Sequence, residues 1–322
     1  MTPLDFLRDV ANPDLRFLLK ALLISVMSSV VCGVIGCHVV LRGMAFIGDA
    51  VTHAVFPGLA VAFVLQGSLV LGGVVAGVAV SVLVAIFSQN RRLKEDSIIG
   101  VLMVAAFALG IVIMSFSPAY AGSLQSFLFG SITGIPDSDL VTAALTGAVV
   151  LVGAILLHRS FVAVSLDREM ARAAGLPVFL LDVLLYILVT VAVVISVQTI
   201  GNILVLALLI TPAATARLLT DRLVPMMVTA PVIGGGCALA GLYLSWALNL
   251  PVGGTIVLVA TVLFLAAWVL APRHGLAARR IRAHQQSADL GAGRARPEKP
   301  SAASSSREGE GAGDVRTPAL MS

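Results

Sequence analysis

The stretch that decides the fold of this chain is CHVVLRGMAFIGDAVTHAVFPG, residues 37–58. It lies between two long apolar runs and still carries the ionisable residues Arg42, Asp49 and His53. A charge at the centre of a bilayer costs about 2.5–3.5 kcal/mol on insertion scales, so ionisable residues at that depth usually mark a pathway or a pairing. If this stretch is helical, Asp49 and His53 lie one turn apart on the same face. Such a pair can hold a divalent cation, share a proton, or simply hydrogen-bond.

The composition of the chain is that of a membrane protein. Of its 322 residues, 58% are hydrophobic and only 12% are charged, whereas an ordinary soluble domain is about 25% charged. Residues 1–272 hold 12 basic and 12 acidic side chains, so the net charge of +4 lies in the tail from Arg273, with its 9 basic and 5 acidic residues. A basic segment after a last membrane helix is typical of the cytoplasmic side, near anionic lipid. No motif supports nucleic-acid binding.

Apolar runs of about 20 residues are long enough to cross a bilayer as helices. We expect such spans at 20–41, 46–66, 69–88, 98–116, 139–157, 181–200, 202–219, 226–247 and 252–271. The second run contains Asp49, His53 and Pro57-Gly58, so a re-entrant or discontinuous helix broken at Pro57 and Gly58 is the alternative there.

The sequence therefore predicts an all-α polytopic membrane protein, a bundle of about eight to nine transmembrane helices. We divide it into an N-terminal segment 1–19, a transmembrane domain 20–272, and a basic cytoplasmic tail 273–322. The tail is rich in Ser, Gly, Ala and Pro and is expected to be largely disordered, because it lacks the apolar residues to bury a core.

The connections between spans predict the orientation of the bundle. Basic residues gather in 89–97, 158–175, 217–223 and the tail, which the positive-inside rule places in the cytoplasm. Counting back through nine full spans puts the N-terminus outside, whereas Arg8, Arg16 and Lys20 favour the inside. The number of full spans and the side of the N-terminus stay open at this point.

The cytoplasmic segment SLDREMARAAGLP, residues 165–177, predicts a short capped helix. Asp167 suits the N-cap, Glu169 the first turn and Arg172 the last, and Gly175 can end the helix in the left-handed conformation. Such a helix either merely connects two spans or docks a cytoplasmic partner. The chain has no GxxxxGK[ST], HExxH or GxSxG motif, so any ATP hydrolysis must come from a separate subunit.

Other polar and helix-breaking residues in the spans have weaker interpretations. His38 and Asn202 are further, weaker candidate metal ligands, and a histidine at such a position more often serves plain packing. Arg42 is expected to be an interfacial anchor that reaches the membrane surface or pairs with lipid phosphate or a carboxylate. Pro212 predicts a hinge or, equally, a packed kink. Gly73 and Gly77 form a GxxxG step suited to close helix packing.

Five motifs together resemble the integral-membrane permeases of ATP-binding-cassette importers for manganese, zinc or iron. In order along the chain they are VVLRGMAFIGDAVTHAVFPGLAVAF, LQSFLFGSITGI, SLDREMARAAGLP, GNILVLALLITPAATARLL and GLYLSWALNLPVGGTIVL, and they span most of residues 20–271. The resemblance implies that Asp49 and His53 contact the transported metal. It also implies that the docking segment, with Asp167, Arg168, Glu169, Ala171, Arg172 and Gly175, binds an ATPase.

The resemblance further implies a set of partners and a location. These are a cytoplasmic ATPase dimer, an extracytoplasmic metal-binding protein, a second permease (a copy or a sibling), and the lipid of a bacterial cytoplasmic membrane, with the C-terminus inside. The metal would be a substrate and not a tightly bound cofactor, and its identity stays open. An ion-coupled secondary transporter without an ATPase is the alternative, and a membrane scaffold without transport is a third reading.

Overall fold

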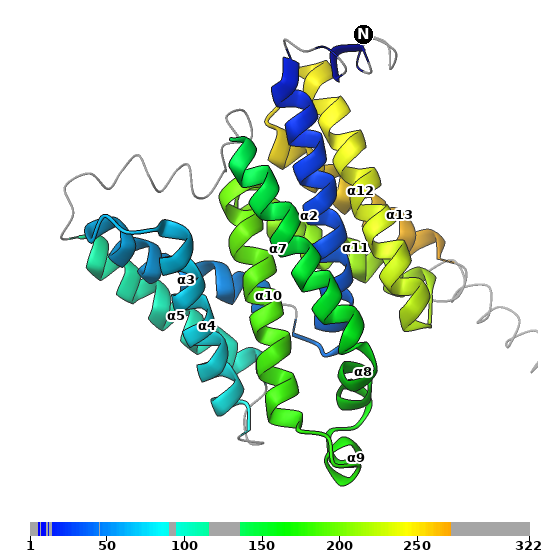
Figure 1. The fold of residues 1–322 in the computed structure, drawn as a ribbon. Coiled ribbons are helices and arrows are strands. Elements are labelled where there is room, and N and C mark those ends of the chain that lie inside the picture. Colours follow the sequence, from blue (N-terminus) through cyan, green and yellow to red (C-terminus); the bar gives the residue numbers. More distant parts are fainter. Residues whose placement is uncertain are drawn as a thin grey trace, which may run out of the picture. The chain divides into compact units, whose positions relative to one another are not determined.

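The computed structural model describes residues 15–44, 46–89, 95–115 and 136–271, together with Phe6, residues 8–10 and Asn12. Its principal elements are helices (Figure 1): α2 Arg16–Leu41, α3 Ile47–Val64, α4 Leu69–Phe87, α5 Glu95–Met114, α7 Asp137–Leu156, α8 His158–Leu166, α9 Arg168–Ala173, α10 Val178–Ile200, α11 Asn202–Leu219, α12 Leu223–Leu248 and α13 Val252–Leu270. The predicted outward motif 124–135 and the predicted tail 273–322 lie outside the described residues.

The helices confirm the predicted fold class for the part of the chain that is described. Eight of them are long and apolar enough to cross a membrane, and α3 is a shorter apolar helix. Each predicted span coincides with one helix, within four residues at either end. The agreement is close because a run of apolar residues in lipid must satisfy its own backbone hydrogen bonds, which a helix does.

The predicted break at Pro57 and Gly58 is wrong. Helix α3 runs without interruption from Ile47 to Val64 with Pro57 inside it. A proline within a helix removes one backbone hydrogen bond, here the one that would reach the His53 carbonyl, and packing can offset that loss. Gly58 serves a different purpose, because a Cβ atom there would overlap the Gly72 carbonyl oxygen of α4. Gly58 thus allows α3 and α4 to lie in close contact.

Pro212 likewise lies inside a continuous helix, α11, and does not break it. Its ring is buried against α12, since a Cβ atom built on Gly234 would lie 3.3 Å from Pro212 Cγ. This is the packed arrangement that the sequence left as one of two interpretations. Movement of α11 at Pro212 stays a prediction.

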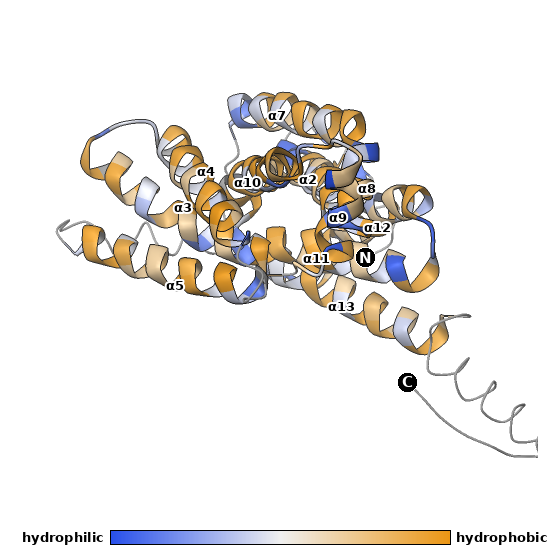
Figure 2. Cartoon of the chain, turned by 90° about the horizontal axis from the view of Figure 1, so that it is seen from below, coloured by the Kyte–Doolittle hydropathy of each residue, from blue (hydrophilic) through white to orange (hydrophobic). Residues whose placement is uncertain are grey.

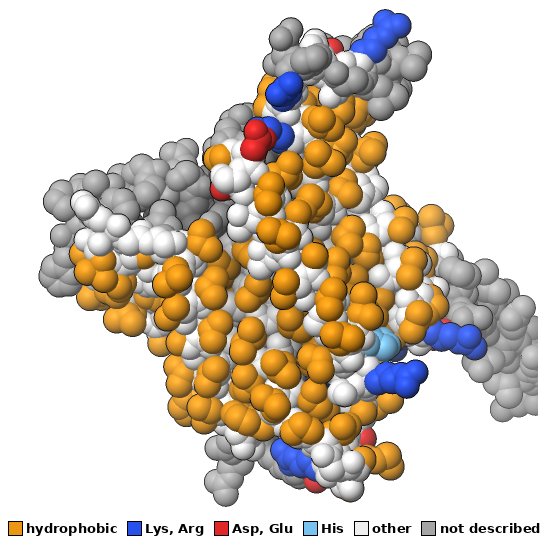
Figure 3. Space-filling model, viewed as in Figure 1, with side chains coloured by type: hydrophobic (Ala, Val, Ile, Leu, Met, Phe, Trp, Pro, Cys, Tyr) orange, Lys and Arg blue, Asp and Glu red, His pale blue; other side chains and the backbone are white. Residues whose placement is uncertain are grey.

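Among the eight helices long enough to cross a membrane, α2, α10 and α11 are the most buried. Between 50% and 61% of the apolar window of each is buried, against 11% for α7 and 17% for α13. Seen along the helices, α10 and α2 lie between the α3–α4–α5 group and α12 (Figure 2). On the face shown in Figure 3, exposed hydrophobic side chains cover most of the surface and charged ones lie at its margins, as expected for a lipid-facing surface.

Small residues set the close contacts between these helices. Gly73 and Gly77 of α4 face Val55 of α3 and Val194 of α10, so the predicted GxxxG step does pack. One turn further along α4, the Ser81 and Thr190 hydroxyls are hydrogen-bonded at 2.6 Å between α4 and α10. In lipid, where apolar side chains gain nothing by leaving the solvent, such close approach and interhelical hydrogen bonds hold helices together.

The two ends of α2 lie at opposite ends of the bundle. Near its start, Lys20 forms a 2.7 Å ion pair with Asp137, the first residue of α7. Beyond its last residue, Arg42 contacts Asp182 near the start of α10 and Ser165 at the end of α8. The basic residues Arg16 and Lys20 are therefore on the opposite side of the bundle from α8 and α9, which agrees with the count of nine crossings.

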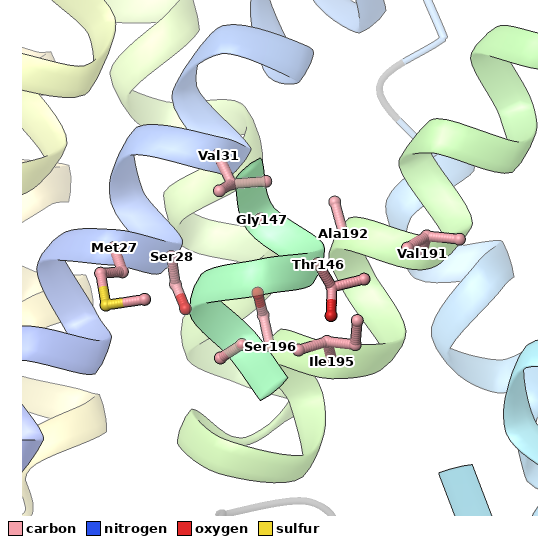
Figure 4. Close-up of a pocket in the computed structure, with 10 residues that line it drawn as sticks. Met27, Ser28, Val31, Thr146, Gly147, Val191, Ala192, Ile195 and Ser196 are labelled. Atoms are coloured by element: carbon pink, nitrogen blue, oxygen red, sulfur yellow. The ribbon is translucent and has the colours of Figure 1, made fainter. Parts of the chain in front are cut away.

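A small cavity of about 20 Å³ lies between α2, α7 and α10 (Figure 4). Three hydroxyl-bearing side chains, Ser28, Thr146 and Ser196, come to it from the three helices, beside Val31 and Ile195. The space is enough for a water molecule. The cavity has no ionisable lining residue, so it is not a candidate for binding a metal ion.

Candidate functional site

Asp49 and His53 are brought together as their spacing predicts. Both lie on α3, Asp49 in its first turn, and His53 Nε2 is 3.4 Å from Asp49 Oδ1. Their side chains are 32% and 28% exposed, so the pair borders the surface of the chain and is not enclosed by it. A carboxylate oxygen and an imidazole nitrogen on one open face are donors that a divalent transition metal accepts.

The pair is held in place by its own helix and by two neighbours. The His53 ring stands edge-on to Phe107 of α5, with centroids 4.8 Å apart. The start of α3 lies against α11, because a Cβ atom on Gly48 would lie 2.6 Å from Leu209 Cδ2. The Thr52 hydroxyl donates to the Asp49 carbonyl at 2.7 Å, so its polarity is satisfied within the helix. The two metal-binding candidates are thus the polar groups that this face leaves for a ligand.

The weaker candidates do not join this pair. His38 is 1% exposed, and its ring lies against His158 and Phe161, with centroids 5.7 and 5.5 Å away. Asn202 begins α11, is buried, and has no hydrogen-bond partner for its Oδ1. Across the described ranges no three residues of the types His, Cys, Asp and Glu come close enough to hold one metal ion. A closed protein site is therefore not formed there, and a metal at Asp49 and His53 would take its other ligands elsewhere.

The short helix α9 has the caps that the sequence predicts. The Asp167 carboxylate accepts hydrogen bonds from the amides of Glu169 at 2.8 Å and Met170 at 3.0 Å, which satisfies two donors at the helix start. Gly175 adopts φ +80°, and its amide donates to the Arg172 carbonyl at 2.9 Å. The Leu176 amide donates to the Ala171 carbonyl at 3.0 Å, completing a two-bond left-handed cap. The helix is only six residues long but is well defined at both ends.

One face of α9 is exposed and the other is anchored. Glu169 Oε1 lies 3.7 Å from Arg172 Nη1, and these side chains are 62% and 48% exposed. Ala171 is buried. This combination gives a charged, exposed surface on a helix that is capped and anchored at its other face.

Arg42 is not the interfacial anchor that the sequence suggested. Its side chain is only 7% exposed, and its Nη1 lies 2.6 Å from Asp182 Oδ1. Its Nε donates to the Ser165 hydroxyl at 3.1 Å, and its guanidinium lies 5.9 Å from the centroid of the Phe161 ring. Of the partners expected for Arg42, the carboxylate is the one found, because a neighbouring helix places Asp182 within reach.

Asp182 is the residue that the sequence analysis missed. It is 4% exposed, and its second oxygen, Oδ2, pairs with Arg168 at the start of α9. Arg42, Asp182 and Arg168, here called the Asp182 triad, therefore join the end of α2, the first turns of α10 and the start of α9. The sequence did contain an indication of this pairing. Asp182 is a lone acid in the apolar run VFLLDVLLYILV, and an acid within a membrane span needs a partner.

Comparisons with known proteins agree with this architecture. The model of a family described as the ABC 3 transport family matches residues 14–271. The manganese transport system membrane protein MntC of Halalkalibacterium halodurans is 41% identical over 263 residues, covering 82% of this chain and 90% of the relative. The chelated iron transport system membrane protein YfeC of Yersinia pestis is 36% identical over 267 residues, covering 83% and 90%.

A solved structure matches as well. PsaBC from Streptococcus pneumoniae in complex with Fab gives a TM-score of 0.71 at 33% identity, covering 80% of this chain and 93% of the matched chain. The family match takes in all nine predicted spans and the docking segment. The chain belongs to the ABC 3 transport family.

Proposed function

We propose that this chain is the membrane-spanning permease subunit of an ATP-binding-cassette importer that moves a divalent transition metal. The observation that carries the proposal is the Asp49–His53 pair, an ionisable carboxylate and imidazole 3.4 Å apart on a helix of a membrane bundle. Relatives named for manganese and for chelated iron transport support a metal such as manganese or iron, and zinc stays possible by its similar ligand preference.

The sparse ligand set suits transport better than storage. Two protein ligands bind a hydrated cation weakly, so water or a second subunit supplies the remaining positions and the ion can move on. Stripping a divalent cation of its water is costly, and ligands that exchange one at a time reduce that cost. We therefore assign Asp49 and His53 as a transient stop for the ion on a path completed by a second permease, a copy of this chain or a sibling.

Energy would come from a cytoplasmic ATPase dimer that binds the exposed face of α9. The absence of a phosphate-binding GxxxxGK[ST] sequence in the 322 residues supports a division of labour between subunits. In this proposal α9 and the C-terminus face the cytoplasm of a bacterial cell, and Lys20 and Asp137 lie at the outer end. An extracytoplasmic metal-binding protein would deliver the ion there.

Reconstitution tests this function against the ion-coupled alternative. Proteoliposomes that hold the chain and its ATPase partner, supplied with the metal-binding protein, should take up Mn²⁺ only when ATP is present on the ATPase side. Uptake without ATP, driven by a proton or sodium gradient, would support a secondary transporter and contradict the proposal. A lack of Mn²⁺ or Fe²⁺ uptake under both conditions would contradict transport of these metals.

The substitution Glu169→Arg should release the ATPase. It reverses an exposed charge in the first turn of α9, where an acidic residue is favoured by the helix dipole and where Arg172 is its ion-pair partner. We expect co-purification of the ATPase with the permease to fall by about tenfold, which corresponds to about 1.4 kcal/mol of binding free energy. The measurement is affinity purification of the tagged permease from detergent-solubilised membranes.

Asp139→Arg is the matched control for Glu169→Arg. It reverses an exposed acidic charge in the first turn of α7, at the opposite end of the bundle. The ATPase should co-purify with this variant as with the parent chain. Undiminished co-purification with Glu169→Arg would mean that α9 is a connecting helix.

A further inference from the structure

The Asp182 carboxylate divides its two oxygens between two helices. Oδ1 pairs with Arg42 and Oδ2 with Arg168. The Asp182 side chain is 4% exposed and that of Arg42 7%, whereas that of Arg168 is 38% exposed. The inner pair is therefore deeply buried, and the outer pair borders water.

These differences in burial give the two ion pairs different strengths. Breaking the inner pair would leave an uncompensated buried charge, whereas the Arg168 guanidinium can be hydrated if it leaves Asp182. The Arg42–Asp182 pair is thus a buried link between the end of α2 and the start of α10. The Arg168–Asp182 pair is the more accessible of the two links.

The inner pair is connected to the metal-binding candidates by a short piece of chain. Arg42 caps the end of α2, Gly43 follows with φ +70°, and α3 begins at Ile47, with Asp49 in its first turn. The turn is closed by backbone hydrogen bonds of 3.1 Å from the Met44 amide to the Val39 carbonyl and from the Ile47 amide to the Met44 carbonyl. The side chain of Met44 is fully buried. These backbone hydrogen bonds link the end of α2 to the start of α3 through Met44.

The outer pair has room to move. A groove of about 160 Å³ borders the triad and is lined by Leu41, Arg42, Val164, Ser165, Leu166 and Arg168. The groove lies between the end of α2, at Leu41 and Arg42, and the chain that runs from the end of α8 into α9. The start of α9 therefore has polar contacts and open space beside it, while Ala171 further along the helix is packed in the apolar core.

We propose that Asp182 is a positioning residue that couples α9 to the helix carrying Asp49 and His53. Movement of α9 on the ATPase pulls Arg168, Asp182 passes this displacement to Arg42, and the turn at Gly43 carries it to the start of α3. The proposal rests on the proposed function, since it assumes ATPase binding at α9 and metal binding at α3. It assigns to the Asp182 triad the coupling between the two.

Arg168→Gln tests the outer link without disturbing the buried pair. The readout is Mn²⁺ uptake per ATP hydrolysed in proteoliposomes, a ratio that does not depend on how much ATPase each variant binds. We expect this ratio to fall by about tenfold, within the usual range of coupling between sites. Arg168→Lys keeps the positive charge and should recover a large part of this ratio. Asp182→Asn removes both links and should lower the ratio at least as much, provided that it inserts into the membrane.

Asp137→Asn is the matched control. Like Asp182→Asn, it removes a carboxylate that forms an ion pair with a basic residue at an end of α2. Here the basic residue is Lys20, near the start of that helix, and the Asp137 side chain is 86% exposed. Its uptake per ATP should equal that of the parent chain. A parental ratio in Arg168→Gln would overturn the proposal, as would an equal loss in the control. If the parent chain itself moves no metal with ATP, the proposed function fails, a result that is distinct from normal coupling in the variants.

Discussion

Cells whose only copy of this permease carries Asp49→Ala or His53→Ala are expected to lose Mn²⁺ accumulation. The change in each case removes one of two adjacent ligand groups on α3. Changes to groups that merely support a metal ligand already cost about 10–100-fold in affinity or activity, so we expect a loss of at least about 100-fold here. The measurement is initial uptake of Mn²⁺, normalised to the amount of permease in the membrane.

The amount of permease in the membrane should stay unchanged in these variants. Both side chains are about one-third exposed, and their mutual contact at 3.4 Å contributes little to folding. Asp139→Asn serves as a control, because it also removes a carboxylate from the first turn of a membrane helix. Normal uptake by both Asp49→Ala and His53→Ala would remove these residues from the path of the ion.

Gly36→Val is expected to destabilise the fold strongly. Gly36 lies where α2 crosses α11, and even a Cβ atom there would overlap the Leu209 carbonyl oxygen. Because that obstacle is backbone within a buried helix, it cannot rotate away as a side chain would. Overpacking of a core costs about 1–3 kcal/mol and more where backbone must shift. We expect the apparent Tm in detergent to fall by about 10 °C, together with a lower membrane yield.

Gly236→Ala is the comparison for Gly36→Val. It adds a methyl group to α12 at a position where nothing lies within 4 Å. Its thermal stability and yield should match those of the parent chain, or rise slightly through the higher helix propensity of alanine. A parental Tm for Gly36→Val would mean that α2 and α11 are farther apart than the structure has them.

Features of this protein that depend on neighbouring residues were predictable from the sequence. Each long helix follows from a continuous apolar run, because lipid leaves a spanning backbone few alternatives. The Asp49–His53 contact follows from a spacing of one helical turn. The caps of α9 follow from Asp167 and Gly175, whose preferences act within three or four residues.

Features that depend on distant residues were decided only by the tertiary structure. Arg42 and Asp182 are 140 positions apart, and nothing local tells whether a charge at a helix end meets lipid or a carboxylate. The predicted break at Pro57 is wrong: α3 is continuous there, and Gly58 instead allows close contact with Gly72 of α4, a residue that no local pattern points to. The residues 37–58 thus determined by themselves that a polar pair lies within a membrane helix. Packing between helices decided how that stretch connects to α9, because partners for a buried charge are supplied by whichever helix the fold places beside it.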